Sequence, residues 1–349
     1  MQASAIVVIG NQFAGTTLSE FARQQRPGQQ GLSGGCVEIL GRSVLELTVN
    51  RLREADIRAI AVIAEAGSVP FWPPRDLEMI AVERSLDCWP RAIHKLKEYA
   101  WQGVEDVIVM ELGPYVECDF AETLRVHHFR QTAATQLQHN QQPLDVWIAS
   151  ARALSASLLD SSALFGIEKI LGTPAPFVVK GYVNRLADAR DLRQLVVDAF
   201  LGHCAIRPRG REVRPGIWMD DGARPHRSAR ILAPAYVGHA VKLEPASVVA
   251  RFSNIERNSR VGAGTVVETA SVLPHTALGK GLDVSQAVVH GNRFADLARS
   301  LVLTVDDPNL IRDTVPRPWR APKPQREVSE PLDTRNQPFE LEGSLQGEL

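Results

Sequence analysis

Between Met219 and Leu273 the first residue of every six-residue step is apolar, and the last eight such positions are all aliphatic. A second column of small residues, with Val241 as its one larger member, lies four positions further along in each step. Neither a helix of period 3.6 nor a strand of period 2 keeps two columns in phase at six. A chain that makes one short strand and one corner in every six residues does, because each step sends one aliphatic side chain inward and places a small residue at the corner. The first column is Met219, Pro225, Ile231, Val237, Leu243, Val249, Ile255, Val261, Val267 and Leu273, and the second is Ala223, Ala229, Ala235, Val241, Ser247, Ser253, Ser259, Thr265, Ser271 and Ala277.

Three such sides close a triangular coil, and coils stack through hydrogen bonds between parallel strands. The pattern resembles the hexapeptide-repeat family, whose fold is a left-handed parallel β-helix. The resemblance implies a solenoid over residues 217–300. After Leu278 the aliphatic register moves by one residue, which predicts a last, irregular coil over Gly279 to Val289. The same fold serves acyltransferases, nucleotidyltransferases and scaffolds, so it does not decide the function.

Length and composition indicate two domains and no nucleic-acid partner. The chain has 349 residues, of which 44% are hydrophobic, and a formal net charge of −1 without a basic patch in the sequence. No stretch approaches the roughly eighteen apolar residues of a membrane span, and the first ten residues do not have the pattern of a signal peptide. We therefore expect a cytoplasmic protein. Its cysteines have no metal-binding or redox spacing and are expected to be buried thiols; they are Cys36, Cys88, Cys118 and Cys204.

The residues before the repeat alternate between apolar runs and helical patterns. Ala5 to Ile9, Asp56 to Ala64 and Asp106 to Met110 read as buried strands, the first followed by a glycine loop. This alternation predicts an α/β sheet with helices on both faces and ligands beyond the carboxyl ends of its strands. We assign this domain to residues 1–205 and a linker to 206–216. Helical patterns cover Ile39 to Ala55, Trp89 to Gln102, Asp119 to Arg130 and the later part of Phe177 to Gly202.

The segment from Gly41 to Ile63 has a Gly-Arg pair, a helix ending in RLREADI and an apolar strand. It resembles the sugar-nucleotide pyrophosphorylase family, which joins a sugar 1-phosphate to a nucleoside triphosphate. Many members carry a hexapeptide-repeat solenoid after the catalytic domain, which is the order found here. The resemblance implies a doubly wound, Rossmann-like nucleotidyltransferase domain followed by a left-handed parallel β-helix. It also implies a nucleotide phosphate loop at Gly10, Gly15, Thr16 and Thr17.

The family's charged catalytic residues are mostly replaced in this chain. Thr17 stands where the family's glycine loop has its arginine, and Gly34 to Val37 lacks the lysine of the family's Pro-Lys-Pro-Leu segment. The metal-binding Asn-Gly-Asp of the family corresponds here to Glu111, Leu112 and Gly113. Nucleotidyl transfer needs magnesium and cationic groups on the phosphates, so the joint loss of these residues predicts a protein that has lost the reaction.

Four side chains remain as candidates for chemistry. Glu111 is the candidate metal carboxylate, with Glu117 as its alternative, and Asn184 lies near the strand end where the family has its second metal-site acid. Hexapeptide acyltransferases use a histidine on a coil as general base at a subunit interface. His239 and His275 each lie two residues after an inward position and are the candidates for that chemistry.

These observations favour a degenerate pyrophosphorylase-like pseudoenzyme, a regulatory or scaffolding subunit in sugar-nucleotide or envelope-polysaccharide metabolism. We expect it to bind a nucleotide or nucleotide sugar weakly or not at all, and to form a homo-oligomer or a hetero-oligomer with an active relative. One alternative is an active nucleotidyltransferase that makes a nucleotide sugar with Mg²⁺, and another is a hexapeptide acyltransferase. Residues 301–349, which are rich in proline, are expected to be an extended or disordered tail.

Overall fold

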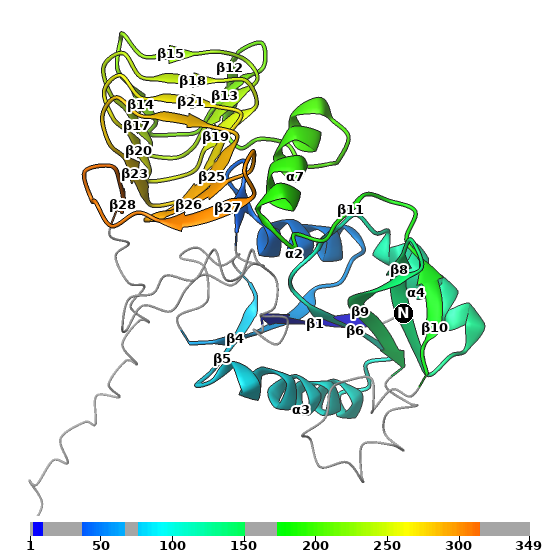
Figure 1. Cartoon of the computed structure of the whole chain (residues 1–349). Coiled ribbons are helices and arrows are strands. Elements are labelled where there is room, and N and C mark those ends of the chain that lie inside the picture. Colours follow the sequence, from blue (N-terminus) through cyan, green and yellow to red (C-terminus); the bar gives the residue numbers. More distant parts are fainter. Residues whose placement is uncertain (1–2, 10–36, 67–75, 151–172, 315–349) are drawn as a thin grey trace, which may run out of the picture. The chain divides into compact units, whose positions relative to one another are not determined.

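The computed structural model describes residues 3–9, 37–66, 76–150 and 173–314 (Figure 1). They form an α/β domain, which extends to Ile206, and a β-rich part over 211–313 that we call the three-sheet region. No helix among the described residues is long and apolar enough to cross a membrane. The predicted phosphate loop with Gly10, Gly15, Thr16 and Thr17 lies outside the described residues, as does the chain beyond 314.

The α/β domain is built on a seven-stranded sheet in the order β10, β8, β9, β6, β1, β4, β5. Neighbouring strands are parallel, except that β9 runs antiparallel to both β6 and β8. The central strand β1 is buried on both faces, which explains its continuous apolar run. The strands of this sheet are β1 (Ala3–Ile9), β4 (Ala59–Glu65), β5 (Glu78–Val82), β6 (Asp106–Glu111), β8 (Ala134–His139), β9 (Gln142–Ser150) and β10 (Ala175–Val178).

Helices cover both faces of this sheet, as the alternating pattern predicts (Figure 1). Leu96 of α3 packs with Ile6 and Val8 on one face, whereas α2, α4 and α7 pack on the other face around Val7. Side chains that precede α2, α4 and α7 accept hydrogen bonds from N–H groups of the first turn and fix where each helix begins. The helices are α2 (Val44–Glu54), the short 3-10 helix η2 (Ser85–Asp87), α3 (Cys88–Trp101), α4 (Phe120–Arg130) and α7 (Ala189–Leu201). A small two-stranded sheet pairs β7 (Tyr115–Val116) with β11 (Val183–Asn184).

The predicted helix from Ile39 begins five residues later than expected, at Val44. Before it, β2 (Glu38–Ile39) and β3 (Arg42–Ser43) form a tight antiparallel hairpin. Its two turn residues, Leu40 and Gly41, have φ values of 52° and 82°. These left-handed conformations cannot continue into a helix, so the sequence prediction of one helix over Ile39 to Ala55 is wrong at its start.

Successive short strands of the three-sheet region belong to its three sheets in rotation (Figure 1). Paired residues are 18 positions apart through the first coils, as in Lys242 with Arg260, and 17 apart later, as in Arg260 with Ala277. The eight-stranded sheet consists of β12 (Arg211–Arg214), β13 (Ile217–Met219), β16 (Ala235–Val237), β19 (Ser253–Ile255), β22 (Ser271–Val272), β25 (Ala287–His290), β26 (Arg293–Asp296) and β27 (Leu301–Thr304). The five-stranded sheet consists of β14 (Arg224–Pro225), β17 (Lys242–Leu243), β20 (Arg260–Val261), β23 (Thr276–Leu278) and β28 (Ile311–Asp313), and the four-stranded sheet of β15 (Arg230–Ile231), β18 (Val248–Ala250), β21 (Val266–Glu268) and β24 (Asp283–Ser285).

The sixfold column is buried as predicted from Val237 to Val267, but its last member belongs elsewhere. Val272, not Leu273, pairs with Ile255 and joins the interior of the three-sheet region, because one coil is a residue shorter at the corner that contains Thr269. Leu273 instead packs with residues of the α/β domain. The register therefore shifts one six-residue step earlier than the sequence suggested.

Small hydroxyl residues at the corners make hydrogen bonds between coils. Ser259 Oγ donates to the carbonyl of Leu273 at 3.0 Å and accepts from the N–H of Thr276 at 3.2 Å. Thr265 Oγ1 makes the same two bonds, with Gly279 and Leu282. A corner leaves backbone groups without a strand partner, so a short hydroxyl side chain there satisfies them. This explains why the second column is small and why it changes from alanine to serine and threonine.

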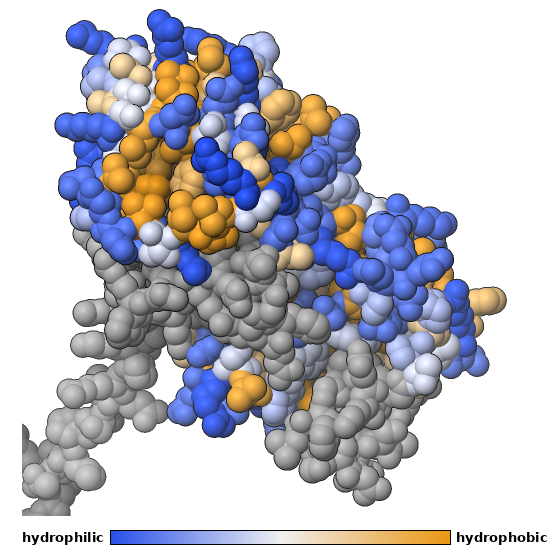
Figure 2. Space-filling view, in the orientation of Figure 1, coloured by the Kyte–Doolittle hydropathy of each residue, from blue (hydrophilic) through white to orange (hydrophobic). Residues whose placement is uncertain are grey.

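Strands extend into both segments that the sequence assigned to irregular chain. β12 lies within the predicted linker 206–216 and pairs with β13. β27 and β28 lie within the predicted tail 301–349 and pair with β26 and β23. Leu301, Val302 and Leu303 of β27 are 44–54% exposed, and Figure 2 shows hydrophobic residues gathered on the three-sheet region. The predicted tail is therefore wrong for these two strands.

A buried network joins the β2–β3 hairpin to the three-sheet region. The Glu256 carboxylate accepts hydrogen bonds from the N–H groups of Leu40 and Gly41, both at 2.9 Å, and from Asn254 Nδ2 at 2.7 Å. Arg257 forms an ion pair with Glu38 at 2.7 Å. Burial raises the pKa of Glu256 and of Glu38 to about 7, although three hydrogen bonds and Arg257 act against this shift at Glu256.

Arg193 attaches helix α7 to the neighbouring strands β19 and β22 of the three-sheet region. Its Nη1 donates to Ser271 Oγ at 3.0 Å and to Asn254 Oδ1 at 3.4 Å. Burial lowers the pKa of this guanidinium to about 10. Asn254 of β19 thus accepts from Arg193 and donates to Glu256, while Ser271 of the neighbouring strand β22 accepts the shorter bond from Arg193.

Replacement of Gly41 by alanine is expected to destabilise the protein by about 2–4 kcal/mol. A methyl group there meets the Tyr236 hydroxyl and Arg209 Cβ, and the φ of 82° is unfavourable for alanine. The check is urea denaturation of Gly41→Ala beside the control Gly103→Ala, whose φ is 81° and whose added Cβ meets no atom within 4 Å. The control measures the conformational penalty alone, at about 1 kcal/mol. Equal losses for the two variants would show that the hairpin is not tightly docked.

Candidate functional site

The carboxyl edge of the α/β sheet has a switch point between β1 and β6. From β1 the chain continues to β4 on one side, and β6 lies against the other side. In open α/β sheets, ligands bind beyond the carboxyl ends of the strands at such a point. The residues that end these strands are Ile9 of β1, Glu65 of β4 and Glu111 of β6. The candidate site is therefore this carboxyl edge of the sheet, where β1 ends at Ile9 and the sequence of the predicted phosphate loop begins.

Glu111 occupies this edge but is held against helix α3. It pairs in register with Val8, whose side chain faces α3, and it is 5% exposed. Trp89 Nε1, in the first turn of α3, donates to Glu111 Oε2 at 3.1 Å. The structure thus places the predicted metal carboxylate beside a neutral indole donor within the packing of the sheet.

Two further groups at this edge, the Cys88 thiol and the Glu65 carboxylate, were not identified as site candidates from the sequence. Cys88 opens α3, and its thiol donates to the carbonyl of Ile9 at 3.7 Å. Burial raises the pKa of Cys88 to about 11, and the carboxylates of Glu65, Glu111 and Asp87 add to this effect. The thiol is therefore protonated at neutral pH and is not a ready nucleophile. The sequence could have indicated Glu65 as a site residue, because it ends the apolar run AIAVIAE just as Glu111 ends DVIVME.

The described residues contain no group of three or more His, Cys, Asp or Glu side chains arranged to hold a metal ion. Glu117, the alternative carboxylate, is already bound by other groups. Tyr115 Oη donates to its Oε1 at 2.6 Å, and Arg51 Nη2 lies 3.3 Å from the same oxygen. The N–H of Ala205 donates to that oxygen as well. These contacts make Glu117 a link between α2, β7 and the end of α7.

Asn184 has a local structural role. Its Nδ2 donates to the carbonyl of Asp191 and its Oδ1 accepts from the N–H of Leu186, both at 2.9 Å. These two bonds shape the turn from β11 into α7. The described contacts use both ends of the amide, so the structure does not favour a role as a retained ligand contact.

The two candidate histidines lie two coils apart on the eight-stranded sheet, after β16 and β22, which are separated by β19. That separation corresponds to about 10 Å. His239 is exposed. His275 is partly buried, and burial, with Arg257 and His290 nearby, lowers its pKa to about 4. His275 is therefore neutral at pH 7, and Arg257, the cation of the coil between them, is engaged by Glu38.

A cavity of about 820 Å³ lies between α2, α4 and the end of β10. Its volume is within the range of small-molecule sites. The wall has cationic, anionic and aromatic parts, represented by Arg51, Asp119, Phe120, Phe177 and Lys180. Lys180 is exposed, whereas Arg51 is fixed by Tyr115 and Glu117. Glu54, Glu117 and Glu122 also line the cavity, so its carboxylates outnumber its cations, and the wall suits a polar ligand rather than an apolar one.

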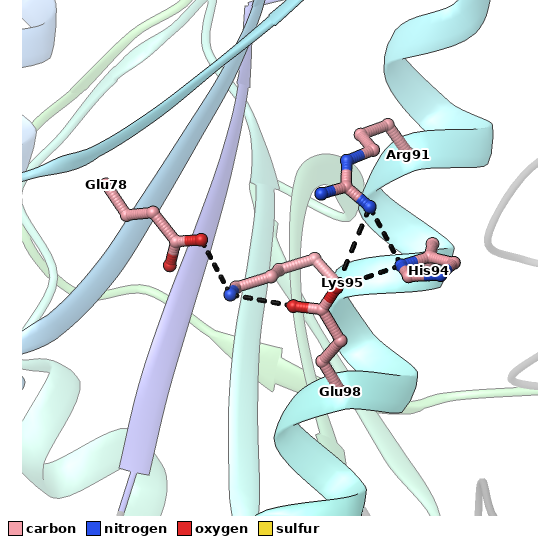
Figure 3. Close-up of polar contacts among 5 residues, drawn as sticks. All are labelled: Glu78, Arg91, His94, Lys95 and Glu98. Carbon is pink, nitrogen blue, oxygen red and sulfur yellow. Dashed lines mark hydrogen bonds and ion pairs between the residues drawn. The ribbon is translucent and has the colours of Figure 1, made fainter. Parts of the chain in front are cut away.

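A charged cluster between α3 and the edge strand β5 is structural (Figure 3). The ammonium of Lys95 donates to Glu78 of β5 at 2.7 Å and to Glu98 at 2.9 Å. Arg91 and His94 lie around the same Glu98 carboxylate, at 3.7 and 3.0 Å. Burial opposes the charge of Lys95, but the two carboxylate bonds outweigh it and raise the pKa of the ammonium. The cluster ties α3 to the edge strand β5.

Trp89→Phe is expected to destabilise the protein by about 1–2 kcal/mol more than Trp147→Phe. The first change removes a donor from the buried Glu111, whereas the indole N–H of Trp147 has no hydrogen-bond partner among the described residues. Both indole rings are buried and lie edge to face with their centroids 5.9 Å apart, so the two variants lose the same ring volume from the same part of the core. Urea denaturation of both variants is the measurement. Equal losses would mean that Glu111 does not depend on Trp89.

Comparison of the chain with protein-family models and with curated proteins finds no match. The geometry of the site and the sequence resemblance are therefore the grounds on which a function is proposed.

Proposed function

We propose that the protein is a degenerate relative of the sugar-nucleotide pyrophosphorylases that binds a nucleotide or nucleotide sugar without transferring it. It acts as a regulatory or scaffolding subunit in sugar-nucleotide or envelope-polysaccharide metabolism. The observation that carries the proposal is the position of Glu111. The acid at the switch point is packed against Trp89, where magnesium-dependent transfer needs a carboxylate directed at the metal.

The sheet topology supports the two-domain part of this proposal. The parallel strands around β1 suit a doubly wound nucleotidyltransferase-like sheet. Pairing at 18 and then 17 residues, with the three sheets visited in rotation, supports a left-handed parallel β-helix of hexapeptide repeats. A solenoid that buries its own coils and one neighbouring domain is suited to holding subunits in place.

The cavity between α2, α4 and β10 is the proposed place for the sugar and phosphate part of the ligand. Lys180 and Arg130 supply positive charge at its wall, and Asp119 and Glu122 supply acceptors for hydroxyl groups. Phe120 and Phe177 give it an apolar portion against which a sugar ring packs. A phosphorylated sugar combines these three kinds of contact.

Thermal denaturation with a panel of nucleoside triphosphates, sugar 1-phosphates and nucleotide sugars, with and without Mg²⁺, tests the proposal. We expect a nucleotide or nucleotide sugar to raise Tm without Mg²⁺, because binding to the folded state alone stabilises it by about 2.7 kcal/mol at one hundred times Kd. Lys180→Gln should weaken this shift, and Arg125→Gln, an exposed cation of α4 that is outside the cavity wall, should not. A Mg²⁺-dependent shift with release of pyrophosphate would overturn the pseudoenzyme and support an active nucleotidyltransferase.

For assembly we propose a homo-oligomer that forms through β27. This strand is an edge of the eight-stranded sheet, and Leu301, Val302 and Leu303 are exposed on it. The opposite edge, β12, has the sequence REVR, and charged side chains protect an edge from pairing. An antiparallel pairing of β27 with its copy closes under twofold symmetry.

Val302→Lys is expected to shift the protein towards the monomer, because lysine on an edge strand opposes strand pairing. Leu232→Lys is the matched control, since Leu232 is similarly exposed, at 52% against 54%, but lies outside β27. Light scattering coupled to size exclusion gives the mass of each. A wild-type monomer, or an oligomer that survives Val302→Lys, would contradict assembly through this edge.

A further inference from the structure

A row of cationic residues crosses the five-stranded sheet of the three-sheet region. Arg224 of β14 pairs in register with Lys242 of β17, and Lys242 pairs with Arg260 of β20. Arg260 pairs with Ala277 of β23, which pairs with Arg312 of β28. Every strand of this sheet thus contributes one residue to the row, and four of the five are arginine or lysine.

Residues paired across neighbouring strands project from the same face of a sheet. Next to the row, Leu243, Val261, Leu278 and Ile311 are buried in the interior of the three-sheet region. Because side chains alternate along a strand, the cationic row faces outward. Arg224, Lys242, Arg260 and Arg312 are all exposed.

The positive charge of this row is only partly balanced. Arg260 forms an ion pair with Glu244. In the described part of the chain, Arg224, Lys242 and Arg312 have no ion pair. Strands are about 4.8 Å apart, so three consecutive cations repel one another and slightly destabilise the free protein. An anionic ligand would remove that repulsion.

We propose that this row is a binding site for a linear polyanion that carries a charge on each repeat unit. The cations form one line along the direction in which the strands stack, and their spacing is set by the backbone rather than by flexible loops. A chain with regularly repeated phosphates or carboxylates fits a line of charges, whereas an anionic membrane surface is matched by cations spread over an area. The arginines supply paired N–H donors for phosphate or carboxylate oxygens.

The site goes beyond the nucleotide function and does not depend on it. It is on the outer face of the three-sheet region, and none of its residues lines the cavity between α2, α4 and β10. A scaffold with this row would hold a charged polymer as well as its protein partners.

Fluorescence anisotropy with the full chain and two labelled probes, inorganic polyphosphate and polygalacturonate, tests the inference and distinguishes a phosphate from a carboxylate source. We expect at least one probe to bind at 50 mM salt, and Arg224→Gln/Lys242→Gln to weaken that binding roughly tenfold. The slope of log affinity against log salt should fall by roughly 2, since each contacting cation releases about one counterion. Arg125→Gln/Arg185→Gln removes the same charge from exposed positions of the α/β domain and should leave binding unchanged.

Several results would overturn the site. These are no binding of either probe at 50 mM salt, equal weakening by the row variant and the control, or binding of galacturonate and phosphate monomers as tight as that of the polymers. The substituted side chains are exposed, and unchanged Tm values for both double variants confirm that the fold is intact. Failure of nucleotide binding in the thermal panel would leave this result untouched, so the two proposals are separable.

Discussion

The Glu256 carboxylate is the contact on which the arrangement of this protein depends. It is fully buried and accepts hydrogen bonds from the turn of the β2–β3 hairpin and from Asn254. A buried carboxylate without such donors would be strongly destabilising, so its presence requires the hairpin to stay docked. The hairpin in turn ends at Ser43, the N-cap of α2, and thereby fixes where that helix begins.

The hairpin and helix α7 both reach the surroundings of Asn254 in the three-sheet region, on β19 and the neighbouring strand β22. The hairpin reaches Glu256, directly after β19, and α7 reaches Asn254 through Arg193. The Arg193 cation and the Glu256 carboxylate are thus joined through a single amide, which keeps opposite buried charges close without direct contact. Removing the Asn254 amide would take a hydrogen bond from both buried groups, and a buried polar group left unsatisfied costs about 1–3 kcal/mol. Such fixed attachment is compatible with the proposed scaffolding role.

The sequence was sufficient for the repeat but not for this junction. The sixfold column predicted the buried residue of each strand from Val237 to Val267, because burial of aliphatic residues is what makes the period. Glu244, Glu256 and Glu268 all follow an inward residue directly, so the pattern treats them alike. Only Glu256 of the three is fully buried, because it follows a strand of the eight-stranded sheet and meets the hairpin turn there. The sequence did not reveal the shorter corner at Thr269, because Val272 and Leu273 are both aliphatic and either residue fits the column.

At the candidate site, the sequence correctly placed Glu111 at the end of a central strand but not on which face of the sheet. Its pairing with Val8 decides that, since residues in register share a face and Val8 faces α3. The position aligned with the family's metal aspartate is two residues on, at Gly113, which has no side chain to offer. Strand register therefore places the Glu111 carboxylate against α3 and apart from Gly113, the metal-ligand position that the resemblance implies. Conversely, the same register rule lines up Arg224, Lys242 and Arg260, which are 18 residues apart in the chain and adjacent in the fold.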